Sequence, residues 1–182
     1  GNFWYANRQY EEAQECWESS VKQDDAFAIT HRNLALLYYN KTNQKELAVT
    51  HLERAFELDN TDARLLMELD QLYKKINISI DKRLALLEKY IDLTNSRDDL
   101  YLERVSLYNL KGDFEKAKEL IESRQFHPWE GGEGKVPFQF LTCYTELAKK
   151  NINLKNYEDA IQLLKAAKTY PHNLGEGKLH GT

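Results

Sequence analysis

Small residues recur along this chain at an interval that few folds use. One series of positions repeats every 33 to 43 residues and consists of Ala13, Ala48, Leu84, Ala117 and Ala160. A second series follows seven positions later and consists of Ser20, Ala55, Ile91, Arg124 and Ala167. Intervals of this length are typical of a repeat built from two helices, because each unit needs its neighbours to bury its apolar face. The sequence therefore predicts an all-α array in which small residues let the two helices of a pair approach closely.

Turn signals between the expected helices agree with this arrangement. Short polar or glycine-containing turns, each leading into an aromatic residue, occur at Gln9-Tyr10-Glu11, Gly112-Asp113-Phe114 and Asn156-Tyr157-Glu158. Most of the eight glycines and three prolines are confined to two loops, so the rest of the chain contains few helix breakers. We expect a partial helix pair before residue 23. The complete helices are expected at about 26–40, 44–58, 62–76, 81–92, 98–110, 113–124, 136–151 and 156–169.

The second unit carries the clearest family resemblance. It reads Asn33-Leu34-Ala35, then Tyr38-Tyr39, then Ala48, and ends on Ala55-Phe56-Glu57-Leu58-Asp59. This resembles the tetratricopeptide repeat (TPR), which has Leu-Gly/Ala-x-x-Tyr on its first helix and alanine at two sites on its second. The resemblance implies a right-handed α-solenoid of about five units that forms a single domain over 1–182. The units are expected at about 1–26, 27–62, 63–96, 97–126 and 137–172.

The third unit departs from that pattern. Leu84 and Ile91 stand where alanines belong, and the turn at 76–80 lacks glycine. Larger side chains keep two helices further apart, so we expect a locally altered twist in this unit.

A nine-residue phrase occurs twice. Pro-x-x-x-Gly-Glu-Gly-Lys-apolar is found in the loops at 127–136 and 171–179, displaced by 43 residues. Alternating glycines permit a backbone that turns successive N–H groups inward, which makes a nest for an anion that Lys135 or Lys178 would complete. The alternative is a structural crossover in which glycine ends one helix and proline prevents its continuation. The phrase is not a P-loop, because Val136 stands where that motif needs Ser or Thr. The candidate contact residues of the two loops are Trp129, Glu133, Lys135, Glu176 and Lys178.

The TPR resemblance also implies a concave groove lined by the first helix of each pair. The residues that it places there are Tyr5, Arg32, Asn33, Tyr39, Arg64, Glu68 and Gln71. Asn2, Asn33 and Arg64 coincide with positions of the clamp that holds a peptide's C-terminal carboxylate in some TPR proteins. Glu68, however, stands where that clamp has an arginine, and its charge would repel a carboxylate. The groove is therefore predicted to bind a protein or peptide, but not by the carboxylate clamp.

Composition limits the other classes of function. The chain has 25 basic and 29 acidic side chains without a basic stripe, which argues against nucleic-acid binding. No apolar run approaches the roughly 18 residues of a membrane span, so we expect a soluble chain, with the cytoplasm favoured. Cys16 and Cys143 are expected to be unpaired thiols, and His31, His51 and His180 have no metal-ligand spacing. We therefore predict no metal, no cofactor and no enzymatic activity.

Three hypotheses remain for the function. The first is a non-catalytic scaffold that binds a protein, a peptide or a neighbouring domain of the same chain through the groove and the two loops. The second is an accessory module of a carbohydrate-active protein, because the loop phrases resemble those of large bacterial proteins that also carry an uncharacterised β-rich, mutarotase-like domain. The third, a self-sufficient enzyme, lacks any nucleophile and base at a workable spacing. The chain is interpreted as an excerpt of a longer protein, because both ends interrupt a repeating pattern.

Overall fold

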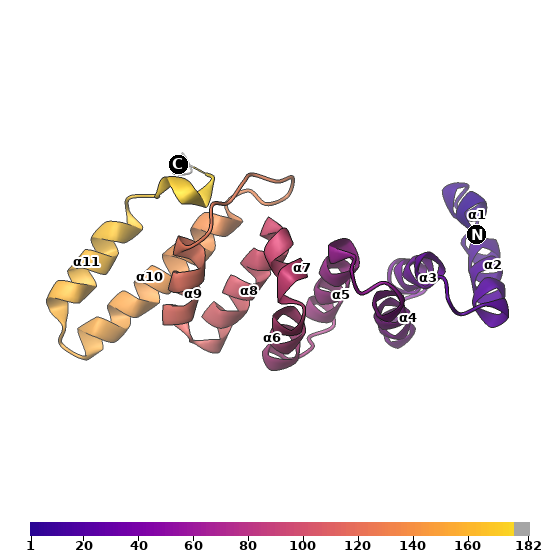
Figure 1. The fold of residues 1–182 in the computed structure, drawn as a ribbon, viewed down its shortest axis with the longest axis horizontal. Helices are drawn as coiled ribbons and strands as arrows, with labels where there is room; N and C mark the ends of the chain where they lie inside the picture. The colour runs from indigo at the N-terminus through magenta and orange to yellow at the C-terminus, as the bar shows by residue number, and fades with distance from the viewer. Residues whose placement is uncertain (177–182) are drawn as a thin grey trace. The chain divides into compact units, whose positions relative to one another are not determined.

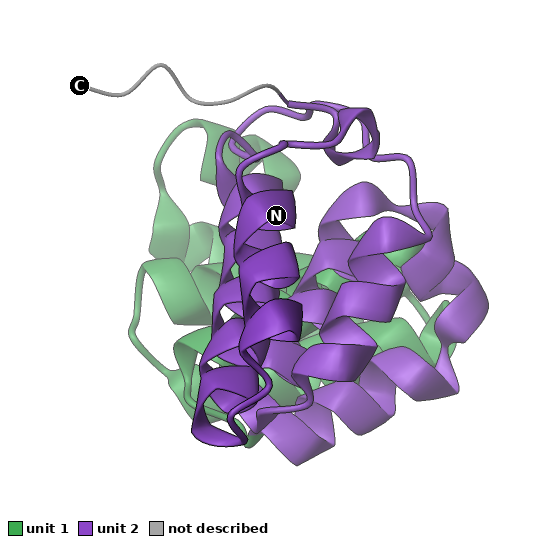
Figure 2. Ribbon diagram, turned by 90° about the vertical axis from the view of Figure 1, so that its left-hand side faces the viewer, with its two compact units in different colours: residues 1–79 green, residues 80–182 purple. Residues whose placement is uncertain are grey.

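The computed structural model describes residues 1–176, and every regular element among them is helical (Figure 1). This confirms the predicted all-α class. The chain divides into two compact units, Gly1–Ser79 and Ile80–Thr182 (Figure 2). The boundary lies between the two helices that the sequence assigns to the third repeat.

Unit 1 is a run of five helices, each of which packs against the next. They are α1 (Asn2–Ala6), α2 (Tyr10–Gln23), α3 (Ala28–Asn40), α4 (Lys45–Leu58) and α5 (Ala63–Lys75). Ala13, Ala48 and Ala55 have no solvent exposure. The small residues of the repeat therefore lie at the helix contacts, as their spacing predicted.

Unit 2 contains the remaining elements. They are α6 (Ile80–Lys89), α7 (Ile91–Ser96), α8 (Asp98–Lys111), α9 (Phe114–Glu122), α10 (Lys135–Asn153), α11 (Tyr157–Ala167) and the 3-10 helix η1 (His172–Leu174). Its core lies among α8, α9, α10, α11 and η1, where Phe126, Val136, Phe140 and Leu174 are each 1% exposed.

The helix expected at 81–92 is broken, and this part of the sequence prediction was wrong. Tyr90 leaves the helical conformation (φ −109°, ψ 51°) and separates α6 from α7. The hydroxyl of the buried Thr94 donates to the carbonyl of Leu87 at 2.9 Å, which satisfies a carbonyl freed by the break. The end of α6 is thus stabilised by a hydrogen bond between residues seven positions apart, rather than by a glycine or a proline.

The turn within each helix pair uses one residue in the left-handed conformation. These residues are Arg8 (φ 61°), Asn43 (φ 53°), Asn77 (φ 61°), Gly112 (φ 84°) and Lys155 (φ 63°). Left-handed backbone closes the end of a helix at little cost only for glycine and, less well, asparagine. The repeat therefore keeps one turn geometry although its sequence supplies the best residue type only once.

A tyrosine–glutamate pair recurs where one helix pair meets the next. In each case a tyrosine hydroxyl on the first helix of one repeat donates to a glutamate on the second helix of the preceding repeat. The pairs are Tyr38 with Glu18, Tyr73 with Glu53, Tyr108 with Glu88 and Tyr144 with Glu122. Burial and the neighbouring carboxylate raise the pKa of each of these tyrosines. The pairs fix the register between successive units, because a shift along the helix axis would leave a buried hydroxyl without an acceptor.

Candidate functional site

An apolar pocket of about 140 Å³ opens between α3, α4 and α5 of unit 1. Its lining contains Leu36, Tyr39, Leu52, Met67 and Leu72. These side chains converge because α3 and α5 are the first helices of successive pairs and present the same face on either side of α4. Such a pocket can take one apolar side chain of a partner.

Polar groups stand around this pocket. Glu68, Gln71 and Asn40 lie in its lining, and the Lys75 ammonium lies 5.0 Å from the centre of the Tyr39 ring. A cation at that distance is attracted to the ring face. The ring thereby holds a positive charge at the pocket rim.

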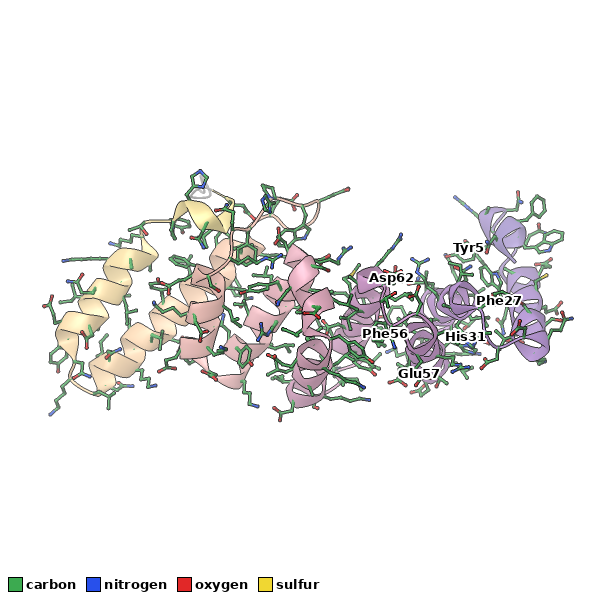
Figure 3. The ribbon with its side chains drawn as sticks, viewed as in Figure 1. Tyr5, Phe27, His31, Phe56, Glu57 and Asp62 are labelled. Carbon is green, nitrogen blue, oxygen red and sulfur yellow. The ribbon has the colours of Figure 1, made fainter. Side chains whose placement is uncertain are left out.

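A second pocket, of about 220 Å³, adjoins the first through Leu36. It is lined by Tyr5 of α1, Trp17 of α2, and Ile29 and Asn33 of α3, and Figure 3 marks Tyr5 on α1. The Asn33 amide donates to Asn2 Oδ1 at 3.0 Å. The two pockets follow the face that the sequence assigned to the groove, and together their linings include Tyr5, Asn33, Tyr39, Glu68 and Gln71.

Arg32, Arg64 and Glu68 form a compact charge cluster beside the first pocket. The Arg32 guanidinium makes two hydrogen bonds to Glu68, at 2.6 and 2.5 Å, and Arg64 Nε reaches the same carboxylate at 3.2 Å. The hydrogen bonds that Arg32 donates to Glu68 outweigh the effect of burial and raise the pKa of Arg32. Glu68 is therefore an internal counter-ion to two arginines, and the cluster retains one net positive charge. Sequence reasoning treated its charge as free to repel a ligand and missed this pairing.

The two Gly-Glu-Gly-Lys loops meet at one end of unit 2. Phe126 N–H donates to the Asn173 carbonyl at 2.8 Å, and the Asn173 amide donates to the carbonyls of Ile121 and Arg124. In Figure 1, η1 lies beside the loop that joins α9 to α10. The described part of the second loop therefore lies beside the end of α9, where the first loop begins. We call the segment 171–176 the clasp.

Glu176 of the clasp lies where one of the two hypotheses for the loop phrase placed an anion. Gly134, which has φ 73° and precedes the first turn of α10, donates its N–H to Glu176 Oε2 at 2.7 Å. A carboxylate at a helix N-terminus is stabilised by the exposed N–H groups and the helix dipole. The chain's own carboxylate thus fills the site for which an external anion was considered.

The other loop candidates divide into two groups. Trp129 is half-buried and packs against the unit 2 core, and its ring lies over Gly132, where an added Cβ would approach it to 2.3 Å. Glu133 and Lys135 are exposed. Lys178 lies outside the described residues.

A partly buried ion pair anchors the start of the first loop. Arg124 Nε donates to Asp98 at 2.6 Å, and the His127 N–H donates to the same carboxylate at 2.9 Å. Burial alone would raise the pKa of Asp98, but these hydrogen bonds outweigh it and lower the pKa. Like the clasp, this contact ties the loop to the helix bundle.

A histidine pair in unit 1 escaped the sequence analysis. His31 Nδ1 lies 2.8 Å from His51 Nδ1, and His31 Nε2 lies 2.7 Å from Asp25, which also binds Arg54 (Figure 3 marks His31). Burial, followed by the proximity of His31, lowers the pKa of His51. The spacing of 20 residues, which also separates three of the tyrosine–glutamate pairs, is the signal that would have found it.

Residues 1–176 contain no group of three or more His, Cys, Asp or Glu side chains arranged to hold a metal ion. Within the same residues, none of the helices has both the length and the apolar character needed to cross a bilayer. Cys16 is exposed and Cys143 is buried, and neither is in a disulfide. Burial raises the pKa of the Cys143 thiol to about 12, so this thiol stays protonated and unreactive.

No protein-family model matches the chain. Among solved structures it is similar to a crystal structure of MamA, with a TM-score of 0.60, 19% sequence identity, and 92% of each chain covered. It is also similar to YrrB, described as a TPR protein with an unusual peptide-binding site, with a TM-score of 0.60 and 14% identity over 96% of this chain and 85% of that chain. At these identities the likeness shows the fold. The chain has the fold of a TPR-type α-solenoid, as the repeat pattern predicted.

Proposed function

We propose that the chain is a non-catalytic interaction scaffold that binds a peptide along the α1, α3 and α5 face of unit 1. The observation that carries this proposal is the pair of adjoining pockets that share Leu36. One pocket would take an apolar side chain of the partner peptide, and the second would take the peptide residues next to it. The peptide bound by the structurally similar YrrB supports the same class of partner.

Charge favours an acidic peptide. Arg32, Arg64 and Lys75 place three positive charges along the groove, and Glu68 and Asp62 supply two negative charges. Because Glu68 is already shared between two arginines, the groove attracts rather than repels a carboxylate side chain. We therefore expect a peptide with a leucine-sized apolar residue next to Asp or Glu.

Selection of a random dodecapeptide phage library on the purified chain tests this function. We expect the enriched peptides to combine an apolar residue with a nearby acid and to bind in calorimetry. Leu36→Glu should abolish that binding, because it places a charge in the wall common to both pockets. Leu47→Glu is the matched control, since Leu47 is on the same unit but is 44% exposed.

The result that would contradict the proposal is equally direct. Peptides that bind the Leu36→Glu and Leu47→Glu variants equally well would move the binding site away from the groove. Failure of the library to enrich any sequence over an unrelated helical protein would remove the peptide-binding function.

The two loops contribute differently. The contact between Glu176 and Gly134 favours the structural interpretation for the glycines and the clasp, because their hydrogen-bonding groups are used within the chain. Glu133 and Lys135 are exposed and Trp129 is half-buried beside them. We propose these three residues as a secondary contact for a neighbouring domain.

A further inference from the structure

Helix α11 carries an apolar stripe on the side that faces away from the unit 2 core. Tyr157, Ile161 and Leu164 are 58%, 45% and 41% exposed, and their spacing of four and three residues places them on one helix face. Ala160 and Ala167, on the adjoining face of the helix, are buried. The apolar surface of α11 is therefore wider than the part that packs on the core.

The position equivalent to Leu164 is buried in other repeats of the chain. Leu164 follows the small residue Ala160 by four positions, and the residues at the same position in earlier units are Trp17, Leu52 and Ile121. These three side chains are 7%, 2% and 0% exposed. In each of those units the next helix packs on this face: α3 on α2, α5 on α4 and α10 on α9. The α11 stripe thus has the geometry of a face that a helix covers.

The charged residue beside Leu164 indicates which side chain a covering helix would carry. Five positions after the small residue, the first, second and fourth repeats have Glu18, Glu53 and Glu122, each of which accepts a tyrosine hydroxyl from the covering helix. The third repeat has Lys89 at this position and uses the preceding Glu88 as the acceptor. The fifth unit has the exposed Lys165 at that position, and Lys168 follows one turn later. A lysine ammonium is a donor only, so a tyrosine hydroxyl cannot donate to it, whereas a carboxylate would pair with it.

We propose that the Tyr157, Ile161 and Leu164 stripe binds an amphipathic helix of a partner protein, and that this helix carries an aspartate or glutamate opposite Lys165. The site lies in unit 2 and does not depend on the groove of unit 1. The first helix of a second copy is a poor occupant, because Asn2–Ala6 is short and contains no carboxylate. The partner is thus a helix with apolar residues at three- and four-residue spacing and an acid at its centre.

A peptide from another repeat of this chain can serve as a probe for this site. The peptide 62–76 contains α5, which covers α4 and whose Tyr73 binds Glu53. A fluorescein-labelled peptide with Tyr73→Glu, held helical by a lactam bridge on its polar side, should bind the chain with a Kd on the order of 10–100 µM in fluorescence anisotropy. The unsubstituted peptide should bind about threefold more weakly, as expected for one exposed ion pair.

Reversal of one charge on the chain should reverse this preference. Lys165→Glu recreates the acceptor present at the other junctions, so this variant should prefer the unsubstituted, tyrosine-containing peptide. Leu164→Ser should weaken both peptides at least tenfold, while helicity by circular dichroism stays unchanged because Leu164 is already partly exposed. Lys45→Glu, which makes the same charge change at an exposed site in unit 1, is the matched control and should keep the wild-type preference.

Three outcomes would overturn the proposal. The first is binding that Leu164→Ser leaves intact, and the second is a peptide preference that Lys165→Glu does not change. The third is self-association of the chain that Leu164→Ser abolishes, which would make a second copy the occupant. Because none of these variants alters the groove, the peptides selected for the groove should bind all of them normally, and failure of one proposal is distinguishable from failure of the other.

Discussion

The two units apply one set of repeat rules but differ in how they connect one helix pair to the next. In unit 1 the connection between α4 and α5 is short and needs only the Asp62 side chain, which accepts from the Arg64 N–H (Figure 3 marks Asp62). In unit 2 the connection between α9 and α10 spans 123–134 and places Phe126 in the core. The short connection in unit 1 leaves the neighbouring helix faces exposed. The long connection in unit 2 carries apolar residues such as Phe126, which must themselves be buried.

The clasp meets that requirement in unit 2. Leu174 enters the core, Asn173 satisfies the carbonyls at the end of α9, and Glu176 binds the start of α10. Unit 1 has no comparable segment among its described residues, and its pockets lie open between the first helices instead. The open pockets agree with the proposal that unit 1 binds a partner, whereas this end of unit 2 is closed by a segment of its own chain.

Truncation of the clasp's apolar side chain should produce the largest change. Leu174→Ala removes a side chain that is 1% exposed and should lower the free energy of unfolding by about 2–4 kcal/mol. Urea denaturation followed by Trp129 fluorescence measures this, since Trp129 packs on the same core. Leu154→Ala, at a leucine that is 62% exposed, should change it by less than about 0.5 kcal/mol. Equal midpoints for the two variants would show that the clasp does not hold the loop.

Overpacking of unit 1 should have a smaller effect. Ala55→Trp forces an indole into a contact without solvent exposure and should cost on the order of 1–3 kcal/mol. Glu57→Ala on the same helix should cost little, because the Glu57 side chain is 67% exposed (Figure 3 marks Glu57). The midpoint of chemical denaturation compares the two variants. If Glu57→Ala were the more damaging change, the register of the second unit would be wrong.

Helix positions could be predicted from this sequence because they depend on local periodicity. Ala48 and Ala55 are seven residues apart on one helix, and the structure buries both where the spacing placed them. The break at Tyr90 could not be predicted, because it depends on the Thr94 hydroxyl reaching the Leu87 carbonyl rather than on a residue type that ends helices. Periodicity reports which residues are buried, not which polar groups find a partner.

For the candidate sites too, the sequence predicted which residues to consider but not which polar groups pair with each other. Repetition of the loop phrase identified both loops as candidate sites, but it could not show that Glu176 of one would bind Gly134 of the other. Sequence reasoning selected Arg32 and Glu68 for the groove without seeing that they pair. The tyrosine–glutamate pairs were readable in principle, since Glu18, Glu53 and Glu88 recur every 35 residues and each has a tyrosine 20 residues later. That pattern was missed because it joins helices of successive units rather than residues on one helix.

The histidine pair offers the most delicate test of the difference between the units. His31 Nδ1 and His51 Nδ1 are within hydrogen-bond distance, so one ring donates and the other accepts, and His31 Nε2 contacts Asp25. Glu18 and Asp25 favour the charged form of His51, but burial and His31 outweigh them and lower its pKa. The folded unit 1 therefore binds fewer protons than the unfolded chain at mildly acidic pH. By linkage, the stability that neutral His51 contributes is complete above the ordinary histidine pKa of 6.5 and is lost as pH falls from there through the lowered pKa.

Denaturation of the chain at pH about 7.5 and about 5.5, on either side of the ordinary histidine pKa, should show this loss as a lower urea midpoint at the more acidic pH. His51→Gln should reduce the difference, because the amide does not titrate. His127→Gln in unit 2 is the control and should keep the wild-type difference, since the His127 side chain is 77% exposed. Glu18 and Asp25, whose pKa values are lowered, lose their contribution only near and below the ordinary carboxyl range and do not affect this window. A His51→Gln variant with the full wild-type pH dependence would assign the loss to other groups and leave the pair a purely structural contact.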